Sequence, residues 1–341
     1  MTRTVRVLTG ATALAFLNGP YSDLYHNDTN ATAYQSPDWL GAWAEQLPAA
    51  ATPMCLVAQV GPGRVEAALA LVRDTTDTHS RLYPLSAPMS DYVRATGPHA
   101  DDLPVAASFA FALTQLAHDG TTVELTDVPA ASSLGRSLAQ TAGREGWQQH
   151  TTQCAEIDLP VDYTAVSPST RRSHRRRQRR WDSLAENRSV VYRRTRTTAE
   201  LLAAHDVLTA LHQRRWASRT LQPDTPHTTT ALGWHTVLER CGADNAFIAT
   251  LAMDGTVIAA QLCLYRRRTC YSLIPAMDPD HQDLAPGHAL LRHLARDLCD
   301  HGFRVLDLGR TAEGQHTYKE QYRPRWTSTV SASRVPHLAA A

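Results

Sequence analysis

Three apolar runs, followed by a helical stretch and one more apolar run, constrain the fold of this chain more than any other feature. The three runs are Ala246–Met253, Val257–Tyr265 and Cys270–Pro275. Asp254-Gly255 joins the first two and is a strong signal for a two-residue hairpin. Pro286–His301 has helical spacing, and Val305–Leu308 is strand-like. The pattern predicts a β-meander, then a helix, then a strand.

The first half of the chain also alternates strand-like and helix-like segments. Ser36-Pro37-Asp38 predicts a helix start, with Ser as the N-cap and Pro in the first turn. Gly61-Pro62-Gly63 separates two strand-like runs and predicts a hairpin. The two halves predict an α/β chain of two domains, each a mixed, largely antiparallel sheet flanked by helices. We expect these domains to span residues 1–160 and 161–333, with residues 334–341 as a flexible tail.

Composition excludes several classes of protein. Of 341 residues, 43% are hydrophobic and 20% are charged, which is typical of globular rather than disordered chains. No apolar run reaches the roughly 18 residues needed to cross a bilayer, so we expect a cytoplasmic protein without membrane contact. Six cysteines occur without a C-x-x-C pair, so the sequence predicts free thiols and no metal site.

Charge is divided unevenly along the chain. Residues 1–150 contain 8 Arg against 14 Asp and Glu, whereas residues 151–341 contain 26 Arg and Lys against 19 Asp and Glu. A polyanionic partner is therefore expected to bind the second half. Lys319 is the only lysine in the chain, which raises the question of whether its position needs an ammonium rather than a guanidinium.

The densest basic segment runs from Arg171 to Arg180, within a predicted helix near the start of the second half. Its seven arginines spread over roughly 240° of the helix surface, since each residue advances by about 100°. Trp181, Leu184 and Ala185 form a narrow apolar stripe by which the helix can dock. So many guanidinium groups repel one another unless a polyanion or acidic neighbours neutralise them. A solvated charged face stays open as the alternative. The candidate donor-binding residues here are Arg171, Arg172, Arg175, Arg176, Arg179 and Arg180.

A second candidate binding element is the start of the helix predicted from Pro286. Free backbone amides at a helix N-terminus suit a pyrophosphate or a carboxylate, and Gly287 allows close approach. Gly287 and His288 are therefore candidate donor-binding residues. A plain first turn with Pro286 at its start is the alternative that the spacing leaves open.

Candidate catalytic residues follow the last strand of the predicted meander unit. Asp307 lies near the end of that strand, and His316, Tyr318 and Lys319 lie on the next short segment. Acyl transfer needs a cation or donor that stabilises the oxyanion and a group that accepts the amine proton. Lys319 suits the first role, and His316, Asp307 or Tyr318 could serve the second. A structural cap is an equal alternative for Asp307.

Taken together and in order, these motifs resemble a known family. The chain is similar to the cellulose-biosynthesis (CelD/BcsL-like) acetyltransferase subfamily of the GNAT superfamily, which is itself related to the Fem aminoacyltransferases. The residues that carry the resemblance are Gln35-Ser36-Pro37-Asp38-Trp39-Leu40, Ser90-Asp91-Tyr92, Arg172, Arg175-Arg176, Arg180, Asp254-Gly255, Ile258-Ala259-Ala260, Asp278-Pro279, Pro286-Gly287, Asp307-Leu308-Gly309-Arg310 and Tyr318-Lys319.

The resemblance implies two tandem GNAT folds that transfer an acyl group to an amine. Ordinary GNAT enzymes use acyl-CoA, whereas Fem-like enzymes use aminoacyl-tRNA, and some relatives attach amino acids to natural products. In Fem-like enzymes the Lys of an aromatic-Lys motif lies by the reacting carbonyl, and Lys319 occupies the matching position. The resemblance also marks Arg310, Asp278 and Tyr92 as candidate substrate-binding residues.

Two donors remain open at this point. A typical CoA loop begins with Gln or Arg, where this chain has Leu284, although Gly287 and Ala289 fit the pattern. The arginine-rich helix exceeds what three CoA phosphates require and suits the acceptor arm of a tRNA. We therefore expect a monomeric aminoacyl-tRNA-dependent transferase that acts on a small-molecule amine of natural-product type, with no bound cofactor. An acyl-CoA-dependent N-acetyltransferase is the alternative, and a non-enzymatic RNA-binding protein is the second alternative.

Overall fold

The computed structural model describes residues 3–61, 63–75, 79–87, 89–141, 146–217, 231–311 and 316–335. The chain forms two compact units. Unit 1 contains Met1–Gln153 together with Thr327–Ala341, and unit 2 contains Cys154–Trp326. This division differs from the boundary expected near residue 160, because the last strand of the chain pairs within unit 1. Of the expected flexible tail, residues 336–341 lie outside the described residues.

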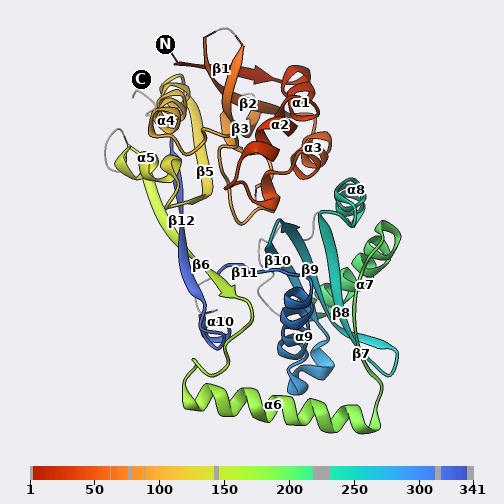
Figure 1. The fold of residues 1–341 in the computed structure, drawn as a ribbon. Helices are drawn as coiled ribbons and strands as arrows, with labels where there is room; N and C mark the ends of the chain where they lie inside the picture. Colours follow the sequence, from red (N-terminus) through yellow and green to blue (C-terminus); the bar gives the residue numbers. More distant parts are fainter. Residues whose placement is uncertain are drawn as a thin grey trace. The chain divides into compact units, whose positions relative to one another are not determined.

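Unit 1 holds most of the first half of the chain (Figure 1). Its elements are β1 (Arg3–Thr9), α1 (Ala11–Leu17), α2 (Tyr21–Asn27), η1 (Ala33–Gln35), α3 (Pro37–Glu45), β2 (Ala51–Val60), β3 (Arg64–Thr75), β4 (Ser80–Pro84), α4 (Leu103–His118), β5 (Thr121–Pro129), α5 (Ser133–Thr141) and most of β12 (Arg325–Arg334). Their strands lie in the order β1-β2-β3-β4-β5-β12.

The sheet of unit 1 is antiparallel except where β5 pairs in parallel with β4. The chain passes between these two strands through α4. In β3 every residue from Glu66 to Val72 is buried. Since successive side chains of a strand point to opposite faces, such a run requires both faces of the sheet to be covered. Side chains of α4, among them Phe109 and Leu113, belong to the resulting core.

Unit 2 repeats this succession of elements. Its elements are the end of β6 (Gln148–Asp158), α6 (Pro168–Asn187), β7 (Val190–Arg194), α7 (Thr198–Ala217), α8 (Ala231–Cys241), β8 (Ala246–Met253), β9 (Thr256–Arg266), β10 (Thr269–Met277), η3 (Pro279–Leu284), α9 (Pro286–Asp300), β11 (Val305–Arg310) and α10 (His316–Glu320). The strand order is β6-β11-β10-β9-β8-β7. Strands β8, β9 and β10 form the predicted meander, and β11 pairs in parallel with β10 after the crossover through α9.

Both units thus contain a strand, helices, a three-stranded meander, a crossover helix and a parallel strand. The last strand of each repeat goes to the other unit: β6 ends beside β11, and β12 pairs with β5 through Thr329↔Pro129 and its neighbours. The predicted fold class, two tandem mixed sheets flanked by helices, is confirmed. In unit 2 residues 258–264 of β9 are all buried, and both α7 and α9 pack on this strand.

The local signals that predicted the turns are also confirmed. Asp254 and Gly255 both have positive φ, 49° and 82°, as the predicted two-residue hairpin requires. Ser36 caps α3, because its side chain accepts a 3.2 Å hydrogen bond from the backbone N–H of Trp39, and Pro37 opens the helix.

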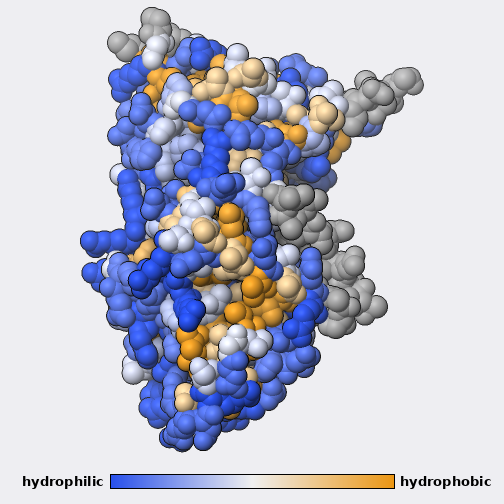
Figure 2. All heavy atoms as spheres, turned by 90° about the vertical axis from the view of Figure 1, so that its right-hand side faces the viewer, coloured by the Kyte–Doolittle hydropathy of each residue, from blue (hydrophilic) through white to orange (hydrophobic). Residues whose placement is uncertain are grey.

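Figure 2 shows hydrophobic residues gathered in patches among hydrophilic ones on the face of each unit that it draws. Within the described ranges, no helix combines the length and the apolar character needed to cross a membrane.

Gly97 gives a direct test of the packing in unit 1. Its φ is 148°, and a Cβ there would lie 2.4 Å from the backbone oxygen of Glu66. Gly97→Ala should therefore lower the free energy of unfolding by about 3 kcal/mol. Urea unfolding checks this value, with Gly287→Ala as the matched control. At Gly287 the nearest atom is Met277 Sδ at 3.8 Å, so stability should stay equal or rise by up to about 1 kcal/mol. Equal stability of the two variants would contradict the account.

Candidate active site

Strands β10 and β11 separate soon after they meet. Their parallel pairing covers only Thr269↔Val305, Cys270↔Leu306 and Tyr271↔Asp307, although both strands continue. On its other edge β10 has a register shift between Ser272 and Ile274. Beyond Tyr271 the facing edges of these two strands therefore have backbone groups that do not pair with each other, which suits an extended ligand that inserts between them.

Lys319 fixes the end of β11 at this opening. Its side chain is 2% exposed, and Nζ donates to the backbone oxygens of Leu308 at 2.9 Å, Gly309 at 2.9 Å and Arg310 at 2.6 Å. A buried ammonium requires such partners, because burial of an unpaired charge is costly. An ammonium has three protons, which explains why Lys rather than Arg suits this position. Oxyanion stabilisation by Lys319 stays a prediction, and the geometry makes Lys319 a residue that positions β11.

The other predicted catalytic residues surround the same strand end. Asp307 is buried, and its Oδ1 accepts a 2.7 Å hydrogen bond from the N–H of Gly309, so its carboxylate caps the local turn. Tyr318 is 37% exposed, with its ring centre 6.0 Å from Lys319 Nζ. The side chain of His316 lies outside the described residues. Proton transfer by any of these groups stays a prediction.

Helix α6 packs against the rest of unit 2 along one narrow edge. His174 and Trp181, seven residues apart, are its two buried residues. Nε2 of His174 lies 2.8 Å from the backbone oxygen of Gln321, and Trp181 Nε1 donates to the oxygen of Leu284 at 3.0 Å. The predicted apolar stripe is thus partly confirmed. Trp181 is buried, whereas Ala185 is exposed, and His174 makes the second buried contact instead of Ala185.

The exposed arginines of α6 occupy the opposite face. Arg172, Arg175, Arg176 and Arg179 are exposed and follow the spacing i, i+3, i+4, i+7. They therefore fall within an arc of roughly 100°, facing away from His174 and Trp181. Within the described part of the chain, none of these four forms a hydrogen bond or an ion pair. We call them the arginine stripe.

Two other candidate arginines of α6 bind the protein itself. Arg171 donates to the backbone oxygen of Thr164 at 2.9 Å. Arg180 forms an exposed ion pair with Asp283 at 2.7 Å. Both contacts hold the ends of the docked edge rather than leave these guanidinium groups open to a ligand.

A small pocket lies between α6 and the first turns of α9. Its lining is polar and aromatic: Tyr163, His174, Arg177, Gln178, Trp181, His288, Ala289, Arg292 and Tyr322. Arg177 donates through Nη2 to Gln321 Oε1 at 2.6 Å, while its buried Nη1 has no partner among the described residues. The Arg292 guanidinium lies 5.1 Å from the ring centre of Tyr163. Two guanidinium groups beside a helix N-terminus suit a phosphate or a carboxylate.

The imidazoles of this pocket are uncharged near neutral pH. Burial, reinforced by the charge of Arg177 and by His174, lowers the pKa of His288 to about 4. Burial also lowers the pKa of His174. His288 Nδ1 shares a 2.6 Å hydrogen bond with Tyr322 Oη, and burial raises the pKa of that phenol. The positive charge of the pocket therefore comes from its arginines.

The start of α9 has no side-chain cap. Ala285, at the N-cap, is in the left-handed region with φ 52°. Pro286 has no N–H to satisfy, and Gly287 is half-buried at the second helical position. The N–H groups of His288 and Ala289 donate to the oxygen of Ala285 at 3.0 and 3.4 Å, so the N–H of Gly287 is the first-turn donor left for a ligand.

The predicted substrate-binding residues belong to different elements, and each has its own contacts. Asp278 is buried as the N-cap of η3, where it accepts from the N–H of Asp280 and forms an ion pair with Arg214 at 3.1 Å. The backbone oxygen of Arg310 is bonded by Lys319. Tyr92 belongs to unit 1, where it is buried beside Tyr34. Their binding of substrate stays a prediction.

Sequence analysis missed several residues of this region. Arg292, Tyr163 and Tyr322 line the pocket although they are far apart in the sequence. Thr311, just after β11, is 5% exposed, and its Oγ1 has no partner in the described ranges. Arg177 could have been found from the sequence, because it belongs to the predicted basic helix. In the structure it lies on the edge of that helix that packs against the rest of unit 2.

A family model named "Acetyltransferase (GNAT) domain" matches residues 168–320. This match covers α6 to α10, including the separating strands, Lys319 and all of the pocket lining except Tyr163 and Tyr322. Residues 168–320 are therefore similar to a GNAT acetyltransferase domain, and we refer to them as the GNAT domain. No curated protein matches the sequence.

Solved structures with low sequence identity share the fold of the whole chain. FemX has a TM-score of 0.62 at 10% identity, with 98% of this chain and 97% of that chain covered. The C-terminal domain of a putative lysylphosphatidylglycerol synthetase from Agrobacterium fabrum has a TM-score of 0.58 at 12% identity, covering 94% and 92%. A tandem GNAT protein from the clavulanic acid biosynthesis pathway has a TM-score of 0.51 at 15% identity, covering 96% and 98%. The chain therefore has the tandem GNAT fold.

Buried neutral histidines should make the GNAT domain sensitive to acid. The pKa of His288 in the unfolded chain is near its ordinary value of about 6.5, and folding lowers it to about 4. As the pH falls between these values, the unfolded chain binds the proton first, so stability is lost. His288→Gln should lose less stability than the wild type between pH 7 and pH 5 in urea titrations. The exposed His150→Gln control should keep the wild-type dependence, and equal curves for all three proteins would contradict this.

Lys319→Met tests the positioning role. Loss of the hydrogen bonds to three buried carbonyls should lower the free energy of unfolding by about 3 kcal/mol, measured by urea unfolding. Glu320→Gln, an exposed neighbour on α10, should leave stability unchanged. If Lys319→Met instead keeps wild-type stability and loses only turnover, the lysine acts on the reacting carbonyl and not on β11.

Proposed function

We propose that this protein transfers an aminoacyl group from aminoacyl-tRNA to an amine of a small molecule. The arginine stripe is the observation that carries the proposal. Four exposed guanidinium groups on one face of α6, without partners in the described chain, repel one another unless an anion lies along them. A nucleic-acid backbone supplies phosphates along such a stripe, and contacts to phosphate need no base sequence.

The pocket beside α9 extends this surface inward. We propose that it receives a phosphate near the acceptor end of the tRNA. Arg177 Nη1, Arg292 and the N–H of Gly287 are the donors available there. The neutral form of His288 adds a polar group to the pocket without a third charge to be desolvated.

The reaction itself is proposed at the end of β11, where β10 and β11 separate. The acceptor amine attacks the ester carbonyl, a C–N bond forms, and the bond from that carbonyl to the ribose oxygen breaks. The ribose oxygen takes up the proton that the amine loses, so the amide and the free ribose hydroxyl are the products. The opening between the strands aligns the aminoacyl group, and Lys319 fixes the carbonyls of Leu308, Gly309 and Arg310 along it.

Similar folds are consistent with this proposal. FemX and the C-terminal domain of a protein named as a putative lysylphosphatidylglycerol synthetase share the fold. The tandem GNAT protein belongs to the biosynthesis of clavulanic acid, which supports an acceptor of natural-product type.

Acyl-CoA is the second candidate donor, and the start of α9 favours it. Gly287 and Ala289 stand in an uncapped first turn, which suits a pyrophosphate. This alternative keeps the same acyl-transfer site but leaves the arginine stripe without a role.

Titration of the purified protein with aminoacyl-tRNA and with acetyl-CoA, at several salt concentrations, distinguishes the donors. We expect saturable, salt-sensitive tRNA binding. In Arg175→Gln/Arg179→Gln, the negative slope of log K against log salt should become shallower by about 1.5, since each lost phosphate contact removes roughly 0.7–0.9 from its magnitude.

The matched control removes the same charge elsewhere. Arg6→Gln/Arg268→Gln changes two exposed arginines of β1 and of the β9–β10 turn, and should keep the wild-type slope. An unchanged slope in both variants would remove the stripe from the donor site. Saturable acetyl-CoA binding without tRNA binding would establish acyl-CoA as the donor.

A further inference from the structure

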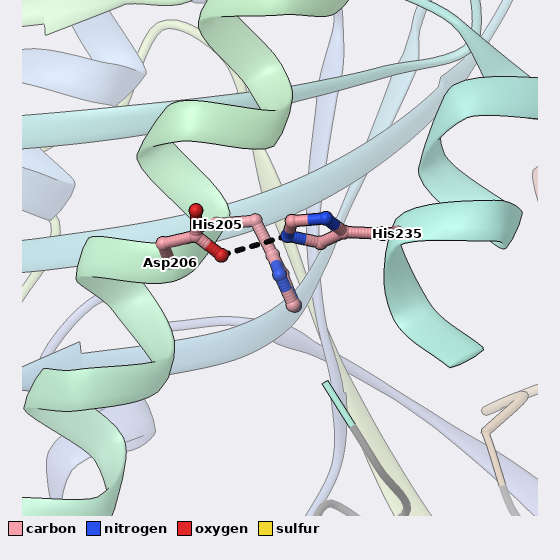
Figure 3. Close-up of side chains that lie close together, drawn as sticks. All are labelled: His205, Asp206 and His235. Carbon is pink, nitrogen blue, oxygen red and sulfur yellow. Dashed lines mark hydrogen bonds and ion pairs between the residues drawn. The ribbon is translucent and has the colours of Figure 1, made fainter. Parts of the chain in front are cut away.

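Helices α7 and α8 bring two histidines and one aspartate together, away from the residues assigned to acyl transfer. His205 and Asp206 are consecutive on α7, and His235 lies on α8 (Figure 3). One nitrogen or oxygen from each side chain can be chosen so that all three atoms lie within 4.8 Å of one another. His235 Nε2 lies 2.7 Å from Asp206 Oδ1, and the two imidazole centres are 5.4 Å apart.

The buried member of this group has an unused polar atom. His205 is 2% exposed, and its Nδ1 has no hydrogen-bond partner among the residues that the structure describes. Buried polar atoms are normally paired, since an unpaired one costs free energy. The hydrogen bond between His235 and Asp206 does not offset this cost, because it does not involve Nδ1 of His205.

Two imidazoles and a carboxylate are side chains that bind divalent metal ions, the imidazoles in their neutral form. The side chains of Asp206 and His235 are 63% and 35% exposed, so an ion can enter from solvent.

We propose that His205, Asp206 and His235 bind one divalent first-row transition ion, with Zn²⁺ as the best fit. Two imidazole nitrogens and one carboxylate oxygen are a donor set that Zn²⁺ accepts. Ligands at about 2.0–2.2 Å from the ion are separated by roughly 3–4 Å, so the side chains need to close by only about 1 Å. The ion replaces the proton between His235 and Asp206, which is released to solvent, and binds one ring nitrogen of His205.

Such an ion would tie α8 to α7 across a separation of 29 residues between His235 and Asp206. Helix α7 packs on β8, β9 and β10, so the link reaches the sheet of the GNAT domain. Because an ion bound only by the folded chain stabilises that fold, Zn²⁺ should raise the Tm of the protein. Three protein ligands leave at least one coordination position for water. This site is independent of the proposed donor and acceptor.

The test uses the full chain, stripped with a chelator and titrated with Zn²⁺ against a competing chromophoric chelator. Asp206→Asn and His235→Gln are the variants, since both side chains are partly exposed and their replacement spares the buried His205. The wild type and the exposed His150→Gln control should bind one Zn²⁺ with equal Kd and gain Tm. Each variant should bind at least about tenfold more weakly and gain less Tm, because even loss of an outer-shell partner has an effect of that size.

Absorption of the Co²⁺ complex identifies the ligands. Bands of a nitrogen- and oxygen-ligated ion, lost in both variants, support the site. A sulfur-to-metal charge-transfer band would place the ion on cysteine and overturn the proposal. Absence of Zn²⁺ binding by the wild type, or equal Kd and stoichiometry in the wild type and both variants, would overturn it as well.

Discussion

The docking of α6 by His174 and Trp181 determines how the candidate active site is arranged. These two side chains bond to backbone oxygens of Gln321 and Leu284, which lie just after α10 and just before α9. With that edge fixed, the arginine stripe has to face solvent, because its residues lie on the opposite side of the helix. The same contact encloses the pocket, since Arg177 lies on the docked edge and Arg292 on α9. One helix thus contributes both to an outer cationic surface and to an inner pocket lined by two arginines.

The second constraint is the end of β11. Parallel strands joined by a crossover helix bring their carboxyl ends to one edge, and the GNAT domain separates them there. Three carbonyls that point toward one ammonium are held more firmly than a strand end in water. A site of acyl transfer depends on such fixed geometry, because small displacements of the reacting groups reduce the rate strongly. Lys319 thereby fixes the strand end at which acyl transfer is proposed.

Local signals in the sequence sufficed for the fold. The apolar runs, Asp254-Gly255 and the Ser36-Pro37 start depend on neighbours along the chain, so a sequence reveals them. Three features depended on distant residues and were not predicted. The strand β12 joins unit 1, the ammonium of Lys319 is buried, and His205 meets His235 on another helix. Asp307 shows the limit: the same residue type suits a proton acceptor or a cap. Its bond to the N–H of Gly309 identifies a capping contact, while proton transfer by Asp307 stays a prediction.

The most direct test of the central claim is an arginine footprint of the donor. Phenylglyoxal modification, mapped by mass spectrometry with and without aminoacyl-tRNA, reports which guanidinium groups the donor covers. We expect strong protection of Arg172, Arg175, Arg176 and Arg179, and none at the exposed Arg6 or Arg268. Unchanged modification of the stripe under saturating aminoacyl-tRNA would contradict the account and leave α6 without a part in donor binding.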